Sequence, residues 1–327
     1  MKIFTRPLWA MIFAASGTLL AQQGTLSGPV AGFVFDHSAH SLRPIRGIPG
    51  ASLLGDAVNF GIDTAAVWVA PKQDSAVVVG TDQSLHLFAL NGGTPAEVSL
   101  SGLAGAPERV VFSPSGTSVA LMGATETRIL TGLPAAPQLN GSVKVPARIV
   151  VGAGRNQQPA LFPTMALSDD GGYALTIAEG SVLLLTPQGQ RRMLAAAQAN
   201  ALLAYAPGSH DAAVMDTRTG LSIIRDTAGA AGTQLLAPPD DGLAGPVGVA
   251  FSQDGKTVYV ASAKSQSVAA ISLASSSRTA IGCNCTPSTL APLGNVFLLT
   301  DVTAGPIWLL DGNAASPRTV FVPARVE

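Results

Sequence analysis

Short apolar runs separated by Ser, Asp, Pro and Gly recur along the chain after its first twenty residues. Three segments share one pattern, in which an apolar residue and a serine precede two turn formers and a glycine: Phe112–Gly116, Leu167–Gly171 and Phe251–Gly255. Weaker copies begin at Val69, Tyr205 and Leu290. Apolar runs bounded by turn residues predict β-strands joined by hairpins.

The six copies recur about every 40–45 residues, which is the length of one four-stranded β-propeller blade. A first, incomplete copy is visible upstream, where Phe33–Asp36 resembles Ala76–Val79, but no clear inner strand precedes Gly32. We therefore predict an all-β fold, a single β-propeller over residues 22–327 with seven four-stranded blades. Six complete blades with an N-terminal extension are the alternative.

Several predicted strands are apolar throughout, such as Val182–Leu185, Val296–Leu299 and Ile307–Leu310. A sheet with one solvated face alternates between apolar and polar residues, whereas a blade packed between two neighbours is buried on both faces. The unbroken runs therefore favour stacked blades. Arg318–Pro323 is predicted as the last outer strand, and the alanine-rich stretch Arg191–Leu203 as an outer strand followed by a loop.

The N-terminus has the order of a secretory signal peptide. Lys2 and Arg6 precede an uncharged run, and the small residue Ala21 ends it before Gln22. The run is shorter than the roughly 20 apolar residues of a transmembrane helix, and no cysteine follows it to carry a lipid anchor. We predict a signal peptide over residues 1–21, a periplasmic or secreted mature chain, and no integral membrane segment after cleavage.

The composition supports an exported β-protein and excludes one class of partner. Charged residues make up only 12% of the chain and apolar residues 47%, with 35 glycines and 23 prolines. The 19 basic and 20 acidic residues nearly balance, and the basic ones form no cluster. A nucleic-acid binder needs concentrated positive charge to replace counterions. We therefore expect no nucleic-acid partner, and the apolar content disfavours disorder.

The segment Gly245–Ala261, which reads GPVGVAFSQDGKTVYVA, resembles the YVTN-type repeat of bacterial β-propellers. This repeat is similar to WD40-like repeats, although the Gly-His and Trp-Asp pairs of true WD40 blades are missing. Families with the repeat include surface-associated proteins, lactonases and subunits of periplasmic redox enzymes. The resemblance implies a propeller scaffold, and a scaffold does not by itself determine function.

Two of the four histidines, His37 and His40, lie together at a predicted strand-to-strand turn. Imidazole groups that converge in a loop can share a metal ion. No further ligands follow at a suggestive spacing, so polar surface residues are the simpler interpretation of this pair. His86 and His210 stand alone and are interpreted as structural.

The two cysteines of the chain, Cys283 and Cys285, are separated by one residue. An exported compartment is oxidising, so we expect them to form a disulfide. A bridge between residues i and i+2 is cramped and needs a local turn. A stapled loop before Pro287 is the simpler interpretation, and redox activity or soft-metal binding through Cys-x-Cys is the functional alternative.

Stacking the repeats aligns an acidic residue in the turn after the second strand of six copies. These acids are Asp36, Asp82, Glu126, Glu179, Asp216 and Asp301, and Lys264 takes the place in the remaining copy. The connections between blades belong to the same face and add Arg109, Asp240 and Asp241. A ring of carboxylates could bind a cation or a basic ligand, but Asp is also favoured in turns because it accepts hydrogen bonds from its own backbone.

Signatures of hydrolysis, phosphate binding and haem attachment are missing from the sequence. We therefore expect no cofactor and no catalytic residue. The favoured hypothesis is a non-catalytic binding or scaffold propeller that holds a small ligand or a protein partner on the loop face at the channel mouth. The alternative is a periplasmic enzyme of the lactonase or redox-accessory type on the same fold.

Overall fold

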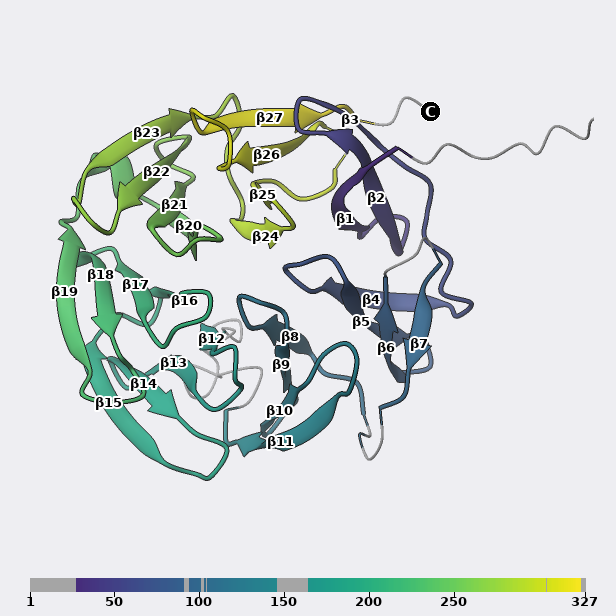
Figure 1. Cartoon of the computed structure of the whole chain (residues 1–327), viewed down its shortest axis with the longest axis horizontal. Helices are drawn as coiled ribbons and strands as arrows, with labels where there is room; N and C mark the ends of the chain where they lie inside the picture. Colours follow the sequence, from purple (N-terminus) through teal and green to yellow (C-terminus); the bar gives the residue numbers. More distant parts are fainter. Residues whose placement is uncertain are drawn as a thin grey trace, which may run out of the picture.

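The computed structural model of the chain describes residues 28–90, 94–100, 103, 105–145, 164–303 and 305–324. The predicted signal peptide lies outside them. Seven antiparallel sheets follow one another around a central axis and close into a ring (Figure 1). The prediction of an all-β propeller with seven blades is confirmed. None of the helical segments in the described part of the chain is long and apolar enough to cross a membrane.

The strands of blades 1 to 4 follow in chain order from the channel outwards. Blade 1 has β1 (Val30–Asp36), β2 (Ser41–Ile48) and β3 (Ala51–Leu54). Blade 2 has β4 (Thr64–Val69), β5 (Ser75–Gly80), β6 (Leu85–Ala89) and β7 (Ala96–Val98). Blade 3 has β8 (Arg109–Phe112), β9 (Ser118–Met122), β10 (Thr127–Thr131) and β11 (Gln138–Val143). Blade 4 has β12 (Met165–Leu167), β13 (Ala174–Ala178), β14 (Ser181–Leu185) and β15 (Arg191–Ala196).

Blades 5 to 7 repeat the same order. Blade 5 has β16 (Leu202–Tyr205), β17 (Ala212–Asp216), β18 (Gly220–Arg225) and β19 (Gly232–Ala237). Blade 6 has β20 (Pro246–Phe251), β21 (Thr257–Ser262), β22 (Ser267–Ser272) and β23 (Arg278–Gly282), preceded by a short 3-10 helix, Asp241–Leu243. Blade 7 has β24 (Ala291–Leu293), β25 (Val296–Leu298), β26 (Ile307–Asp311) and β27 (Arg318–Val322). The predicted outer strand at the start of Arg191–Leu203 is present as β15, and β16 begins at Leu202 after the loop. The predicted last outer strand is present as β27.

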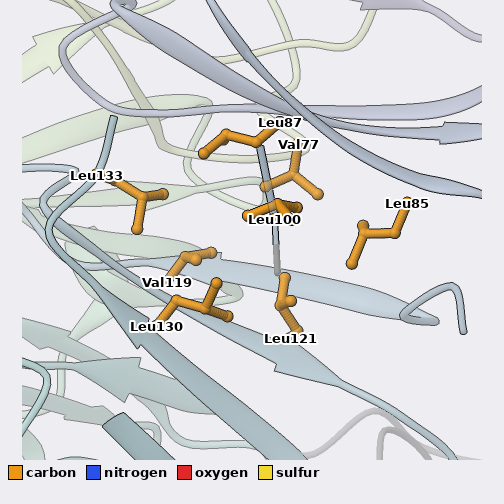
Figure 2. A pocket seen from close by; sticks show the side chains of 8 residues that line it. All are labelled: Val77, Leu85, Leu87, Leu100, Val119, Leu121, Leu130 and Leu133. Atoms are coloured by element: carbon orange, nitrogen blue, oxygen red, sulfur yellow. The ribbon is translucent and has the colours of Figure 1, made fainter. Parts of the chain in front are cut away.

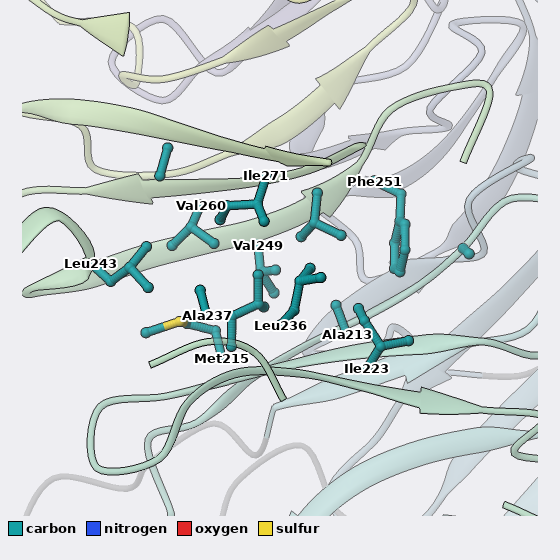
Figure 3. Packing of buried hydrophobic residues seen from close by; sticks show 14 residues of the cluster. Ala213, Met215, Ile223, Leu236, Ala237, Leu243, Val249, Phe251, Val260 and Ile271 are labelled. Atoms are coloured by element: carbon teal, nitrogen blue, oxygen red, sulfur yellow. The ribbon is translucent and has the colours of Figure 1, made fainter. Parts of the chain in front are cut away.

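The core is divided among the interfaces between blades, because successive strand residues point to opposite faces of a sheet. Figure 3 shows the interface of blades 5 and 6, where Val249, Phe251 and Ile271 pack against Met215 and Ile223. Ala250, between the first two, packs instead toward blade 7. Both faces of a blade are therefore dry, which explains the unbroken apolar runs.

The interface of blades 2 and 3 illustrates how tightly these faces fit. Its one described void has a volume of about 10 Å³, too small for more than one water. Eight apolar side chains line it, as Figure 2 shows: Val77, Leu85, Leu87, Leu100, Val119, Leu121, Leu130 and Leu133. These side chains offer a water no hydrogen-bond partner, so the void is dry.

Blade 1 differs from the others because its three strands correspond to the second, third and fourth strands of a complete blade. Asp36 pairs with Ser41 across a four-residue turn, as Ser262 pairs with Ser267 in blade 6. Ile45 packs against blade 7, as the matching Ile271 packs against blade 5. β3 contacts β27 at the outer rim, as β23 does. The described residues thus form six four-stranded blades and one blade without an inner strand.

The direction of β1 agrees with this assignment. The start of β1 lies beside the turn between β24 and β25, where the carbonyl of Ala31 adjoins Gly294 and the side chain of Leu293 fills the space beside Gly32. β1 therefore runs opposite to the inner strands of the other blades. Alternating strand direction requires this, because a blade of three strands must begin on one face of the ring in order to end on the other.

Ring closure depends on side-chain packing between the first and last blades. Val34 and Ile45 of blade 1 meet Leu293, Leu309 and Val322 of blade 7 in one buried cluster. No strand of the described residues crosses from one of these blades to the other. The hydrophobic effect therefore closes the ring, at roughly 1.5–3 kcal/mol for each large side chain that is fully buried.

Candidate functional site

The two faces of the ring carry different loops. The connection face has the turns between second and third strands together with the links from one blade to the next. The opposite face has the turns between first and second strands. All nine polar candidates from the sequence, and the cysteine pair, lie on or beside the connection face, since each falls in one of its turns or links. Chain topology alone places these residues on one face. Whether they have a role depends on the contacts that each side chain makes.

A central cavity of about 950 Å³ runs along the inner strands. The inner strands of blades 2 to 7 line it, and β1 takes the corresponding place in blade 1. Residues of the opposite-face turns, such as Lys72, Ser115, Asp169 and Gln253, also line it. Its volume falls within the range of small-molecule binding sites, roughly 300–1,000 Å³.

The cavity wall is unequal around the ring. Blades 1 to 3 contribute large aromatic side chains that keep partial exposure: Phe33, Phe35, Trp68 and Phe112. At the position of Trp68, blades 4 to 6 have Ala166, Ala204 and Ala250. The partly exposed aromatic rings are therefore on blades 1 to 3, where they are available for stacking, while the aromatic side chains that line the cavity from blades 5 to 7, Tyr205, Phe251 and Phe297, are buried.

Of the acidic and basic candidates, Arg109 and Asp301 line this cavity. They come from blades 3 and 7, and His37 of blade 1 joins them. Burial lowers the pKa of the Arg109 guanidinium from its ordinary value. Asp301 is exposed and accepts a hydrogen bond from the Ser288 hydroxyl at 3.2 Å.

The other acids are engaged by their own turns or by neighbouring strands. Asp82 accepts hydrogen bonds from the backbone and hydroxyl of Ser84. Glu126 accepts one from Ser142 at 3.2 Å, and Glu179 pairs with Arg191 at 2.7 Å. These contacts support turn chemistry as the origin of the acidic pattern.

Asp36 and Asp216 are the two buried members of the acidic set. Asp36 accepts hydrogen bonds from the hydroxyl of Ser38, at 2.6 Å, and from Arg43, at 3.1 Å. The hydrogen bond from Ser38 is the main reason that the pKa of the Asp36 carboxyl lies below its ordinary value. Asp216 accepts from the backbone N–H of Arg218 and Gln198. Both carboxylates stabilise the local backbone.

The remaining polar candidates lie in the link between blades 5 and 6. Asp240 forms an ion pair with Arg278 on the outer strand of blade 6. Asp241 begins the 3-10 helix. Asp240 does not line the cavity.

The histidines are placed in three different environments. The His37 ring contacts Phe35 edge-on, with centroids 4.9 Å apart, and His40 is exposed in the same turn. The described residues contain no group of three or more His, Cys, Asp or Glu side chains suited to a metal ion. His210 bonds Asp170 at 2.9 Å, between blades 5 and 4.

His86 has two polar partners that the sequence did not indicate. Its Nδ1 lies 2.6 Å from Glu97 and its Nε2 lies 2.7 Å from the Ser84 hydroxyl. A serine, a histidine and a carboxylate in series form the arrangement of a hydrolytic triad. Here the Ser84 hydroxyl donates to Asp82, so its oxygen is left to accept from the imidazole. The chain of contacts therefore fixes the turn between β5 and β6.

Cys283 and Cys285 are joined by a disulfide in the structure, with Cα atoms 5.0 Å apart. Cys283 is buried among residues of blades 6 and 7, including Leu290 and Phe297. The bridge thus lies at a packed link between blades. Its formation in the exported protein stays a prediction.

The opposite face contains hydrogen bonds between blades that sequence reasoning missed. Asp169 of blade 4 accepts from the backbone of Ser115 in blade 3 and of Gly208 in blade 5. Gln253 of blade 6 donates to the carbonyl of Gly294 in blade 7. The residue directly after each Leu-Ser or Phe-Ser pair was the available signal, but its partners lie about one blade away in sequence.

Comparison with known proteins supports the fold and nothing finer. No family model and no curated protein matches the chain. Among solved structures, a functionally unknown protein from Desulfotomaculum acetoxidans DSM 771 is similar, with a TM-score of 0.57 and 12% sequence identity. The match covers 90% of this chain and 99% of that one. At this identity, the likeness shows a shared β-propeller fold.

Proposed function

We propose that this protein is an exported, non-catalytic binding propeller that holds its ligand in the central cavity. The observation that carries the proposal is the cavity of about 950 Å³, with aromatic side chains on blades 1 to 3 and alanines on blades 4 to 6. Apolar walls with a few polar groups at their ends are typical of binding sites. Export rests on the N-terminal sequence.

The alternative, a lactonase-like or redox-accessory enzyme, needs acids and histidines that converge on the cavity. Among the described residues that line it, the acids are Asp169 and Asp301, and the histidine is His37. Asp169 already accepts hydrogen bonds from Ser115 and Gly208. This distribution favours binding over catalysis.

The test uses Trp68 as a reporter. The chain has three tryptophans, of which Trp9 lies in the predicted signal peptide, so the variant Trp308→Phe leaves Trp68 alone in the mature protein. The probe is the fluorescent dye bis-anilinonaphthalene sulfonate. We expect saturable one-to-one binding with energy transfer from Trp68. Ala204→Phe, which narrows the cavity, should weaken the binding at least about tenfold.

A matched variant separates the cavity from the acidic turns. The triple variant Asp82→Asn, Glu126→Gln and Asp216→Asn should bind the dye as the wild type does. Loss of binding in the triple variant with full binding in Ala204→Phe would move the site to the connection face. If the dye binds saturably and neither Ala204→Phe nor the triple variant changes its affinity, the cavity proposal is contradicted.

A further inference from the structure

Within the described part of the chain, blade 1 has no inner strand, and the inner edge of β1 is open to the cavity. In the six complete blades, the second strand is paired on its inner side with a first strand. β1 has β2 as its only strand partner among the described residues, and Phe33, Val34 and Phe35 line the cavity directly. Backbone groups on the free side of such a strand are a template for another strand.

One side chain already satisfies part of this edge. The backbone N–H of Phe33 donates to Oε1 of Gln73 at 2.7 Å, across forty residues of sequence. Gln73 belongs to the opposite-face turn of blade 2, and the neighbouring Pro71 carbonyl accepts from the N–H of Gly294 in blade 7. The turn of blade 2 thus spans the place of the missing strand at the opposite face. The part of β1 from Phe33 to Asp36 extends from there toward the connection face.

We propose that an extended segment of a partner protein binds in the cavity as the missing inner strand of blade 1, paired with the open edge of β1. The inference rests on the proposed function and names the chemistry of its ligand. Peptides commonly bind by adding a strand to an exposed sheet edge, where the backbone supplies affinity and the side chains supply specificity. Like the other inner strands, the segment would run antiparallel to β1.

The surroundings define the residues of the segment. The inner strands of blades 2 and 7, β4 and β24, contact β1 and flank the open edge. Their cavity-lining residues, including Val67, Val69 and Leu293, are apolar, so uncharged β-branched and aromatic side chains fit. Asp301 of blade 7 lines the connection-face end of the cavity. Its carboxylate favours a free α-amino group or a basic residue at the N-terminal end of the segment.

The probe is a synthetic peptide with the sequence of the inner strand of blade 6 and its flank, Pro246–Ser252, which folds beside a second strand in this same protein. Binding to the mature chain is measured by titration calorimetry and by Trp68 emission in Trp308→Phe. N-methylation of alternate residues removes the backbone donors of one side only. We expect one alternate set to weaken binding at least about tenfold and the other set to have little effect, because the losses from several backbone hydrogen bonds add up.

A matched variant and the dye separate this inference from the proposed function. Gln73→Ala, in the opposite-face turn of blade 2, should leave peptide binding equal or stronger because it frees the Phe33 N–H. Dye binding without peptide binding would overturn the inference and leave the proposed function standing. Equal sensitivity to both N-methylated sets would also overturn it, because it would indicate apolar capture without strand pairing.

The same peptide experiment distinguishes two other possible occupants of the β1 edge, the chain's own N-terminal segment and a second copy of the chain. Peptide binding that appears only after residues 22–27 are removed would assign the edge to the chain itself. Self-association in sedimentation that the peptide disperses would assign the edge to a second copy. Either result overturns the assignment to a partner.

Discussion

Blades 1 and 6 show how one repeat can serve two purposes. Their matching residues, Ile45 and Ile271, are both fully buried and pack against the preceding blade. In blade 6, the inner strand β20 covers β21 and separates it from the cavity. In blade 1 no strand of the described residues covers β1, and β1 faces the cavity. A complete blade therefore contributes stability, whereas blade 1 closes the ring and also exposes the edge that we propose as a binding site.

The largest expected effect tests the packing side of this comparison. Ile271→Ala should lower the free energy of unfolding by about 3–5 kcal/mol, because its cluster is large and rigid and leaves a cavity. The matched Ile45→Ala should cost less, about 2–3 kcal/mol, because the smaller cluster beside the open edge can collapse. Urea unfolding measures both. A larger loss for Ile45→Ala would reverse the comparison.

The second prediction concerns the turn at the end of β1, where Asp36 stands in place of Ser262. Asp36→Asn should destabilise the protein by about 1–3 kcal/mol at pH 7, because a buried charged acceptor loses strength. The pKa of Asp36 lies below its ordinary value, so its contribution is present above pH of about 4 and is lost as pH falls through the folded-state pKa.

The stability gap between wild type and Asp36→Asn should therefore shrink on acidification. Thermal unfolding between pH 7 and pH 3 measures it. Glu126→Gln is the control, because Glu126 is exposed in the equivalent turn of blade 3 and should show no resolvable change. A gap that widens at low pH would mean that the folded-state pKa is raised.

The third prediction concerns close approach between blades. A Cβ on Gly248 of β20 would lie 2.4 Å from the Cβ of Leu290 and 2.7 Å from its backbone nitrogen. The backbone of Leu290 cannot move aside easily, so Gly248→Ala should lower the free energy of unfolding by about 1–3 kcal/mol. At Gly32 of β1, only the flexible side chain of Leu293 is in the way, so Gly32→Ala should cost less. Gly282→Ala, with open space, is the control for unfolding measurements.

The smallest expected effect concerns the disulfide between blades 6 and 7. Its loop is very short, so loop-closure entropy predicts a loss of only about 1–2 kcal/mol in the variant Cys283→Ser, Cys285→Ser. Mass spectrometry of non-reduced peptides from the exported protein should find the two residues linked. Two free thiols would contradict the pairing and return the Cys-x-Cys segment to the functional alternatives.

The sequence was sufficient for the features that depend on local periodicity and turn chemistry. Apolar–Ser–turn–Gly anchors identified the blades, and the lack of an inner strand before Gly32 was visible because no anchor precedes it. The positions of Asp82 and Glu179 followed from their place in the repeat, and their contacts with Ser84 and Arg191 are those that turns and hairpins favour.

Contacts between blades could not be predicted, because their partners are set by the curvature of the ring. The bond from Phe33 to Gln73 and the bonds of Asp169 with blades 3 and 5 join residues about forty to fifty positions apart. The triad-like chain through His86 needs Glu97 from another strand. No local pattern marks such partners.

The sequence by itself determined the fold class and the face on which each turn lies, because strand period and turn residues act over a few positions. It favoured seven blades but left six open. Only the tertiary structure showed that Asp82, Glu126, Glu179 and Asp216 form local hydrogen bonds or ion pairs. It also showed that Trp68 and Phe112 face a cavity. It alone showed that the inner edge of β1, which has no strand partner in the described part of the chain, faces this cavity. These groups come together because the ring closes. Ring closure depends on the packing of all seven blades, so no local sequence pattern indicates it.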